Sequence, residues 1–266
     1  MNLTRMFAIF LRQMYLVRGS IARVLPLFVW ATVDITLWGF MTRFLSQIEP
    51  HAYNFVPAML GAVLLWDFFI RVMNGVTMTF FEDVWSRNFL NIFATPLSIP
   101  EYLGGLVLSS IATSSVGLVV MLVLATTVFG LSFAVYGVLI LPFLLVLFLF
   151  GIALGILGTA VVLRFGPAAE WFVWPIPAIV SPFVGVYYPV STLPQWMQVV
   201  SRILPPSYVF ESLRNITSGR DPHLENLAWA FGLVILEILI VCSVFTQTYR
   251  LAVRTGLIAR YSAESV

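Results

Sequence analysis

The sequence contains no lysine, and this absence excludes two kinds of chemistry. All 14 basic residues among its 266 residues are arginines. A phosphate-binding loop of the Walker A type needs a lysine on the nucleotide phosphates, and Schiff-base enzymes need a lysine amine. The chain therefore cannot contain a standard nucleotide-hydrolysing site, and we expect it to bind no cofactor itself.

Cysteine and histidine are almost as rare. Cys242 is the single cysteine, so no internal disulfide can form. Its place inside an apolar run is typical of a small buried hydrophobe. His51 and His223 are far apart in the sequence and fall in predicted loops. Two such histidines without a cysteine partner predict no metal site.

Charged residues make up only 10 % of the chain, and apolar residues make up 60 %. A soluble domain is about a quarter charged. No basic run is long enough to follow a phosphate backbone, so we expect no nucleic-acid partner. The composition predicts a polytopic membrane protein surrounded by membrane lipids.

Six apolar runs reach about the 20 residues that a bilayer crossing requires. They cover residues 24–46, 55–79, 103–129, 135–163, 168–188 and 227–249. The fifth is the shortest and contains three prolines. Gly151 and Gly155 in the fourth have the spacing of a helix-packing face. The sequence predicts an all-α membrane protein with six transmembrane helices, in a single domain over residues 1–266.

The segment 1–22 reads as an amphipathic helix lying along the membrane surface. Its arginines Arg5 and Arg12 lie opposite an apolar face on a helical wheel, although Ile9 and Leu16 interrupt the polar side. That apolar face consists of Leu3, Met6, Phe7, Phe10, Met14 and Val17. A cleaved signal peptide is the alternative. It fits poorly, because the arginines alternate with the apolar residues and no small-residue cleavage site follows.

Arginine placement predicts the orientation. Six crossings put both termini on one side. That side then carries nine arginines: Arg5, Arg12, Arg18, Arg23, Arg87, Arg164, Arg250, Arg254 and Arg260. The other side carries Arg202, Arg214 and Arg220, all in one long loop. Both termini are therefore expected in the cytoplasm, with the protein in a bacterial inner membrane.

The segment 189–219 is apolar but too broken by proline to cross a bilayer. We expect one short helix over residues 195–204, a break at Pro205 and Pro206, and a second helix over residues 207–217 that Gly219 ends. Each helix spans about half a bilayer. The pattern favours a helical hairpin that enters the outer leaflet and returns. An ordinary outer-surface loop is the alternative.

The segment 82–94 carries an aromatic stripe. Trp85, Phe89 and Phe93 recur every four residues beside Glu82, Asp83 and Arg87. Such a helix on the cytoplasmic side can insert into a groove of a partner protein. The alternative is that the aromatic stripe simply lies against the bilayer.

Four ionisable residues fall near the middle of predicted membrane helices: Asp34, Asp67, Arg71 and Glu237. Ionisable groups at this depth are costly unless they are paired or face water, so they are functional candidates. Asp67 and Arg71 are four residues apart and can form a structural pair, which Asp34 can join. Glu237 has no evident partner on its own helix.

Two stretches resemble the ABC-2 type of transporter permease. The outer one includes GVYYPVSTLPQWMQ at residues 185–198 and ILPPSYVFESLR at residues 203–214; the inner one includes EDVWSRNFLN at residues 82–91 and EYLG at residues 101–104. The resemblance implies a coupling helix at residues 82–94 that docks on a separate ATP-binding-cassette ATPase. It also implies re-entrant helices at residues 189–219 by an outer gate. The outer candidates are Tyr187, Tyr188, Pro189, Leu193, Pro194, Trp196, Pro205, Pro206, Tyr208, Glu211 and Arg214.

On this resemblance, ATP and Mg²⁺ bind the partner subunits, of which there are two copies, and a second permease copy completes a homodimer. Aromatic-rich walls favour an amphiphilic, drug-like or lipid-like cargo moving outward, with a polysaccharide or lipid-linked glycan as the second choice. Two other classes stay open. An intramembrane aspartyl protease could use Asp34 and Asp67, but their flanking residues lack glycine. An ion-coupled secondary transporter would need no ATPase.

Overall fold

The computed structural model describes residues 2–48, 55–86, 91–92 and 94–256, and these residues form helices and turns without a strand. Among the described residues, six helices are long: α1 (Leu3–Arg18), α2 (Ile21–Ile48), α3 (Phe55–Trp85), α5 (Ile99–Thr127), α6 (Ile140–Phe165) and α11 (Leu224–Arg254). Four are short: α7 (Glu170–Val173), α8 (Ile176–Val184), α9 (Gln195–Ser201) and α10 (Pro205–Thr217).

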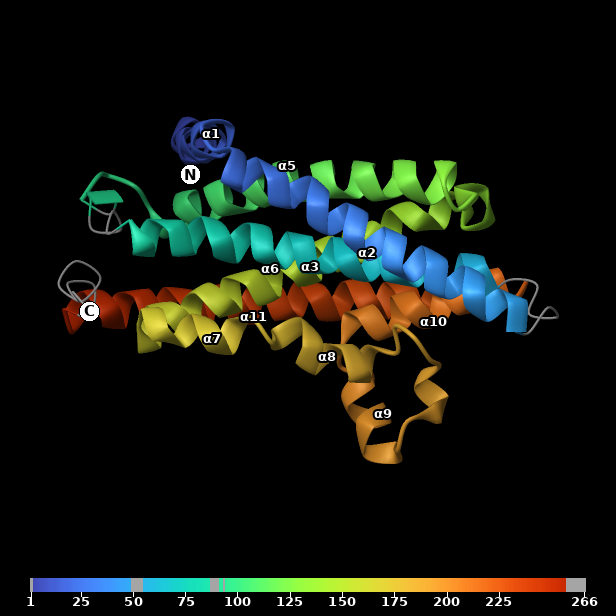
Figure 1. The fold of residues 1–266 in the computed structure, drawn as a ribbon. Helices are drawn as coiled ribbons and strands as arrows, with labels where there is room; N and C mark the ends of the chain where they lie inside the picture. Colours follow the sequence, from blue (N-terminus) through green and yellow to red (C-terminus); the bar gives the residue numbers. More distant parts are fainter. Residues whose placement is uncertain (1, 49–54, 87–90, 93, 257–266) are drawn as a thin grey trace.

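Five helices lie lengthwise beside one another, namely α2, α3, α5, α6 and α11 (Figure 1). Each is long and apolar enough to cross a membrane. They coincide with five of the six predicted runs and extend most of them by several residues. The chain is therefore an all-helical protein with at least five candidate membrane spans.

The predicted run 168–188 is instead broken into α7 and α8. The break falls at Trp174 and Pro175, and Pro177 and Pro182 follow within α8. Proline removes a backbone donor and clashes with the preceding turn, so one continuous helix is not formed here. The two pieces nevertheless follow each other along the bundle (Figure 1).

Helix α3 is the most buried of the five candidate spans. It packs against α2, α5 and α6. The glycines predicted as a packing face allow the α6 contact: a methyl group at Gly151 would lie 2.9 Å from Val72 Cβ, and one at Gly155 would lie 2.7 Å from Val76 Cβ. Small residues at these positions let the two backbones approach closely.

Helices α2 and α11 lie at the edge of the bundle and are the least buried of the five. Large apolar side chains on both are exposed, among them Trp30 and Phe44 on α2 and Trp229 and Leu239 on α11. An apolar surface of this extent is expected against lipid or another protein rather than against water.

Helix α1 is seen end-on where the long helices are seen lengthwise (Figure 1), so it crosses them. It packs on α5, where Met6 and Ile9 contact the glycine pair Gly104 and Gly105. The sequence placed Met6 on the apolar face and Ile9 among the polar residues, whereas the structure docks both on α5. Leu3 and Tyr15 are exposed.

Helix α1 and the last turns of α11 lie at the same end of the bundle, called here the α1 end (Figure 1). Helix α9 projects sideways from the other half. Helix α10 begins at Pro205 rather than after the two prolines, because proline is well tolerated in the first helical turn. Gly219, at a φ of +69°, follows its end as predicted.

Candidate functional site

Two charged clusters contain most of the predicted ionisable residues, and the first lies at mid-length of α2 and α3. Arg71 donates from Nε to Asp67 Oδ2, and from Nη2 to Asp67 Oδ1 at 3.3 Å. Its Nη2 also lies 3.8 Å from Asp34 Oδ2 on α2. The structure thus joins three of the four predicted intramembrane residues. We call Asp34, Asp67 and Arg71 the mid-depth cluster.

Helix α5 leaves room for the arginine in this cluster. A methyl group at Gly117 would lie 2.7 Å from Arg71 Cδ and 3.0 Å from its Nε. Only a glycine therefore allows the arginine to lie against α5 in this position. The Asp67 and Arg71 side chains are 11 % and 12 % exposed, whereas that of Asp34 is 41 % exposed.

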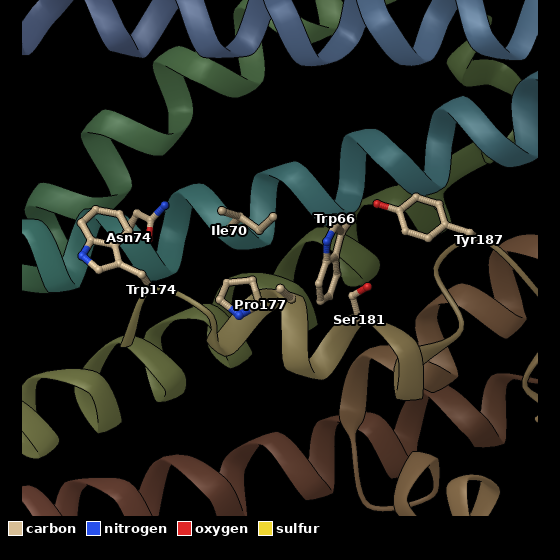
Figure 2. A pocket seen from close by; sticks show the side chains of 8 residues that line it. Trp66, Ile70, Asn74, Trp174, Pro177, Ser181 and Tyr187 are labelled. Atoms are coloured by element: carbon tan, nitrogen blue, oxygen red, sulfur yellow. The ribbon is translucent and has the colours of Figure 1, made fainter. Parts of the chain in front are cut away.

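An aromatic-lined cavity of about 380 Å³ lies between α3 and the α7–α8 segment. Trp66 and Trp174 flank it and Pro177 lies between them, as Figure 2 shows. Asn74 and Ser181 add polar groups to an otherwise apolar lining. This hollow is partly open to its surroundings, and it combines aromatic walls with polar groups, as small-molecule sites also do.

Tyr187 connects this cavity to the mid-depth cluster. It lines the cavity, and its hydroxyl points toward Trp66 (Figure 2). Its ring stacks on Trp38 of α2, one helical turn beyond Asp34, with ring centroids 4.9 Å apart. The cavity and the cluster are therefore neighbours.

The second cluster lies at the α1 end, and we call it the inner cluster. Arg12 of α1 donates to Asp83, which also accepts from the Tyr102 hydroxyl at 2.8 Å. Glu82 pairs with Arg23 at 2.9 Å and accepts from the Gln13 amide. The two acids predicted to face an ATPase thus hold α1 and the start of α2 in this chain.

Helix α5 contributes a third acid to the inner cluster. Glu101 caps the start of α5, accepting from the Ser98 backbone at 2.9 Å. It also accepts from the Asn2 backbone at 2.7 Å and lies 3.5 Å from Arg5. The inner cluster therefore contains three acids and three arginines, each acid paired with one arginine.

The aromatic stripe predicted for the ATPase contact is described only in part. Trp85 ends α3 with half its surface exposed, and its indole donates to Glu170 of α7 at 3.0 Å. Arg87, Phe89 and Phe93 lie outside the described residues. Trp85 therefore links α3 to the broken segment at the α1 end.

The predicted outer residues gather around α10. Arg214 donates to Gly185 O at 2.6 Å and to Glu211 at 2.8 Å, and Glu211 accepts from the Val190 backbone at 2.7 Å. Tyr208 donates to Arg202 O at 2.8 Å. These bonds tie two parts of the chain to α10: the connection between α8 and α9, which includes Tyr188, Pro189, Leu193 and Pro194, and the end of α9. Pro206 is buried in the first turn of α10.

Helix α9 is attached by few contacts. Trp196, at the edge of Phe183, is 63 % exposed, and Val199 and Ile203 are each 61 % exposed. Helix α10, by contrast, buries Phe210 and Leu213 completely. The two short helices thus differ sharply: α10 belongs to the bundle core and α9 presents an apolar face outward.

Glu237, the fourth predicted intramembrane residue, is separate from these groups. Its Oε2 is buried and has no hydrogen-bond partner among the described residues. In the described part of the chain, no three His, Cys, Asp or Glu side chains come together as metal ligands.

Comparison with known proteins identifies the family. Residues 40–246 match the sequence model of the ABC-2 family of transporter proteins. The chain belongs to this family. It is therefore a transmembrane permease component of an ABC transporter, a class that works with a partner ATPase subunit. No curated protein matches the sequence.

Sequence reasoning missed several residues that complete these sites. Arg12 counted toward the polar side of a surface helix and toward the orientation, and Tyr102 was part of a motif, yet both bond to Asp83. Trp66 and Trp174 gave no signal, because aromatic residues are common in every apolar run.

Proposed function

We propose that this chain is the permease half of an ATP-driven exporter in a bacterial inner membrane. Two copies form one pathway, and two separate ATPase subunits bind ATP and Mg²⁺ on the cytoplasmic side. The cargo is an amphiphilic, drug-like or lipid-like molecule that moves outward. The main support for this proposal is an aromatic-lined cavity at mid-length of a chain that belongs to a permease family.

Six crossings are part of the proposal, with α7 and α8 together as the broken fifth one. Their course along the bundle from the α1 end supports this arrangement (Figure 1). An even number of crossings agrees with α1 and the last turns of α11 lying at one end. The excess of arginines at that end supports a cytoplasmic location of both termini.

Helix α1 is proposed to lie along the cytoplasmic membrane surface. It crosses the long helices, and its outward apolar residues, such as Leu3 and Phe7, would contact lipid. The arginine pairs of the inner cluster then connect this surface helix to the ends of α3 and α5. A push by the ATPase on residues 82–94 would reach the bundle through the same end.

The coupling proposal is tested by introducing negative charges into the aromatic stripe of residues 82–94. We expect the double substitution Trp85→Asp, Phe89→Asp to separate ATP hydrolysis from transport, because charges disrupt insertion into an apolar groove. Transport and ATPase activity are measured on the complex in proteoliposomes. Intact assembly together with intact transport would contradict ATPase docking at this segment.

Helices α9 and α10 are proposed as the re-entrant pair at the outer mouth. The exposed apolar face of α9 supports membrane insertion, because in water it would be an unfavourable surface. A cysteine at Val199, in a Cys242→Ala background, should be protected from a membrane-impermeant thiol reagent in intact cells. A cysteine at the exposed Asp221 is the labelled control. Full labelling of both positions would mean a plain surface loop.

The decisive experiment for the function is co-purification with a candidate ATPase, followed by a screen for compounds that stimulate its hydrolysis. We expect amphiphiles to stimulate hydrolysis in the complex and not in the ATPase alone. Stimulation only by oligosaccharides would favour the glycan exporter, since aromatic rings also stack on sugars. Transport by the permease without any ATPase would favour an ion-coupled transporter and would contradict the proposal.

A further inference from the structure

The mid-depth cluster contains more acid than base. Asp34 and Asp67 share Arg71, which among the described residues is the only cation within ion-pair distance of either carboxylate. The other arginine near Tyr187 is Arg214, which reaches Gly185, and that arginine is balanced by Glu211. With all groups ionised, the region therefore holds one uncompensated negative charge.

The excess charge is located on the accessible side of the cluster. Arg71 makes a two-point contact with Asp67, and both side chains are nearly buried. Asp34 contacts Arg71 only at the longer distance of 3.8 Å, and its side chain is 41 % exposed. A carboxylate in an apolar surrounding that is only partly neutralised attracts a cation strongly, because screening by water is weak there.

The neighbouring cavity has walls that suit the same kind of ligand. Trp66, Trp174 and Tyr187 line it, and the Tyr187 ring joins it to the turn of α2 that carries Asp34. Aromatic faces attract cations through their ring electrons, most of all organic cations that are weakly hydrated. The apolar part of an amphiphile would occupy the remaining wall at Ile70 and Pro177.

We propose that the aromatic cavity and the mid-depth cluster form a subsite for an organic cation, so that the exported cargo is a positively charged amphiphile. The charged group lies against Tyr187 and Trp66 on the side of Asp34, and the apolar body fills the cavity toward Trp174. The statement that this cation is exported cargo rests on the proposed function. The binding of the cation itself requires only this chain.

A purely structural cluster accounts less well for these features. In the inner cluster each acid has an arginine of its own, whereas the two acids of the mid-depth cluster share one. The second acid adds desolvation cost without a second base. A proton shared between Asp34 and Asp67 would also remove the excess charge, and it is the competing explanation that the experiment must separate.

The test measures binding of two ions of the same shape and opposite charge to the purified full chain. Tetraphenylphosphonium is the cation and tetraphenylborate is the anion, and equilibrium dialysis in a non-ionic detergent gives both dissociation constants. The ratio of the two constants removes the shared apolar contribution. Because the ATPase is absent, failure here is distinct from failure of the exporter proposal.

We expect wild type to prefer the cation and Asp34→Asn to lower that preference roughly tenfold, as removal of a partly desolvated charge requires. Glu225→Gln, which removes an exposed carboxylate in the first turn of α11, should leave the ratio unchanged. An unchanged ratio in Asp34→Asn would mean that the cluster is already neutral through a shared proton, and the proposal would be wrong.

A second pair of variants tests the aromatic part independently. Trp174→Leu should weaken binding of the cation about threefold, as loss of one cation–aromatic contact predicts. Trp171→Leu removes a more exposed tryptophan of α7 that does not line the cavity, and it should have no effect. Equal loss of binding in both variants would place the cation outside this cavity and would overturn the proposal.

Discussion

The inner and the mid-depth clusters use the same residue types in different proportions. At the α1 end, Glu82, Asp83 and Glu101 each have an arginine, and those arginines come from α1 and the start of α2. At mid-length, Asp34 and Asp67 have one arginine between them. The inner cluster joins elements that would otherwise separate, and it is balanced. The mid-depth cluster borders a cavity, and its acids outnumber its arginines.

This difference indicates how charge is divided between stability and function. A balanced, hydrogen-bonded pair at the end of a helix stabilises one arrangement of the chain. An unbalanced group inside a membrane helix costs stability and is retained only where it does something else. The following substitutions separate the two roles, beginning with the largest expected loss of stability.

Removing Arg12 should have the largest effect on stability. Arg12→Leu leaves the Asp83 carboxylate, whose side chain is 1 % exposed, with no positive partner. We expect a loss of about 3 kcal/mol in the free energy of unfolding, as for other broken buried pairs. Circular dichroism during thermal unfolding in detergent measures it. Arg5→Leu, at a more exposed pair, is the control and should lose clearly less. Equal losses would mean that the Arg12–Asp83 pair is not special.

Gly117→Ala tests the packing of the mid-depth cluster. The new methyl group would lie 2.7 Å from Arg71 Cδ, so either the arginine or α5 must move. We expect a loss of about 2 kcal/mol from overpacking. Gly232→Ala on α11 is the matched control, since a methyl group there meets nothing within 4 Å, and it should be neutral or slightly stabilising. Tolerance of both changes would show that Arg71 does not need its observed position.

Tyr102→Phe tests the inner cluster more gently. It removes the hydroxyl that donates to Asp83 at 2.8 Å and keeps the ring in place. We expect a loss of about 1 kcal/mol, typical of one hydrogen bond to a charged group that keeps its other partner. In the Arg12→Leu background the same change should cost more, because Asp83 then loses the last side-chain donor that the described residues provide. Strict additivity in this double-mutant cycle would contradict a shared cluster.

Much of the fold followed from the sequence because run length and proline position act locally. The five candidate spans, the small-residue spacing of Gly151 and Gly155 on α6, and the cap at Gly219 all depend on residues close together in the chain. The broken run 168–188 was the exception. Its apolar composition suits a crossing, yet its prolines prevent one continuous helix.

The sites were less predictable because their partners are distant in sequence. Asp67 and Arg71 share a helix and could be paired from spacing alone, but the contact between Asp34 and Arg71 depends on how α2 lies against α3. Likewise, Asp83 meets Arg12 across 71 positions, and Trp66 and Trp174 line the same cavity only because the α7–α8 segment returns to α3. No local sequence pattern predicts these contacts between distant residues.

The most direct test of the account is ATP-driven accumulation of tetraphenylphosphonium in inside-out proteoliposomes that contain the permease and its ATPase. Asp34→Asn balances the mid-depth cluster, so we expect its unfolding midpoint to stay near that of wild type. We expect its ATP-driven accumulation of the cation to fall about tenfold, in line with loss of one partly desolvated charge. Accumulation equal to wild type would contradict the claim that the unbalanced acid serves transport.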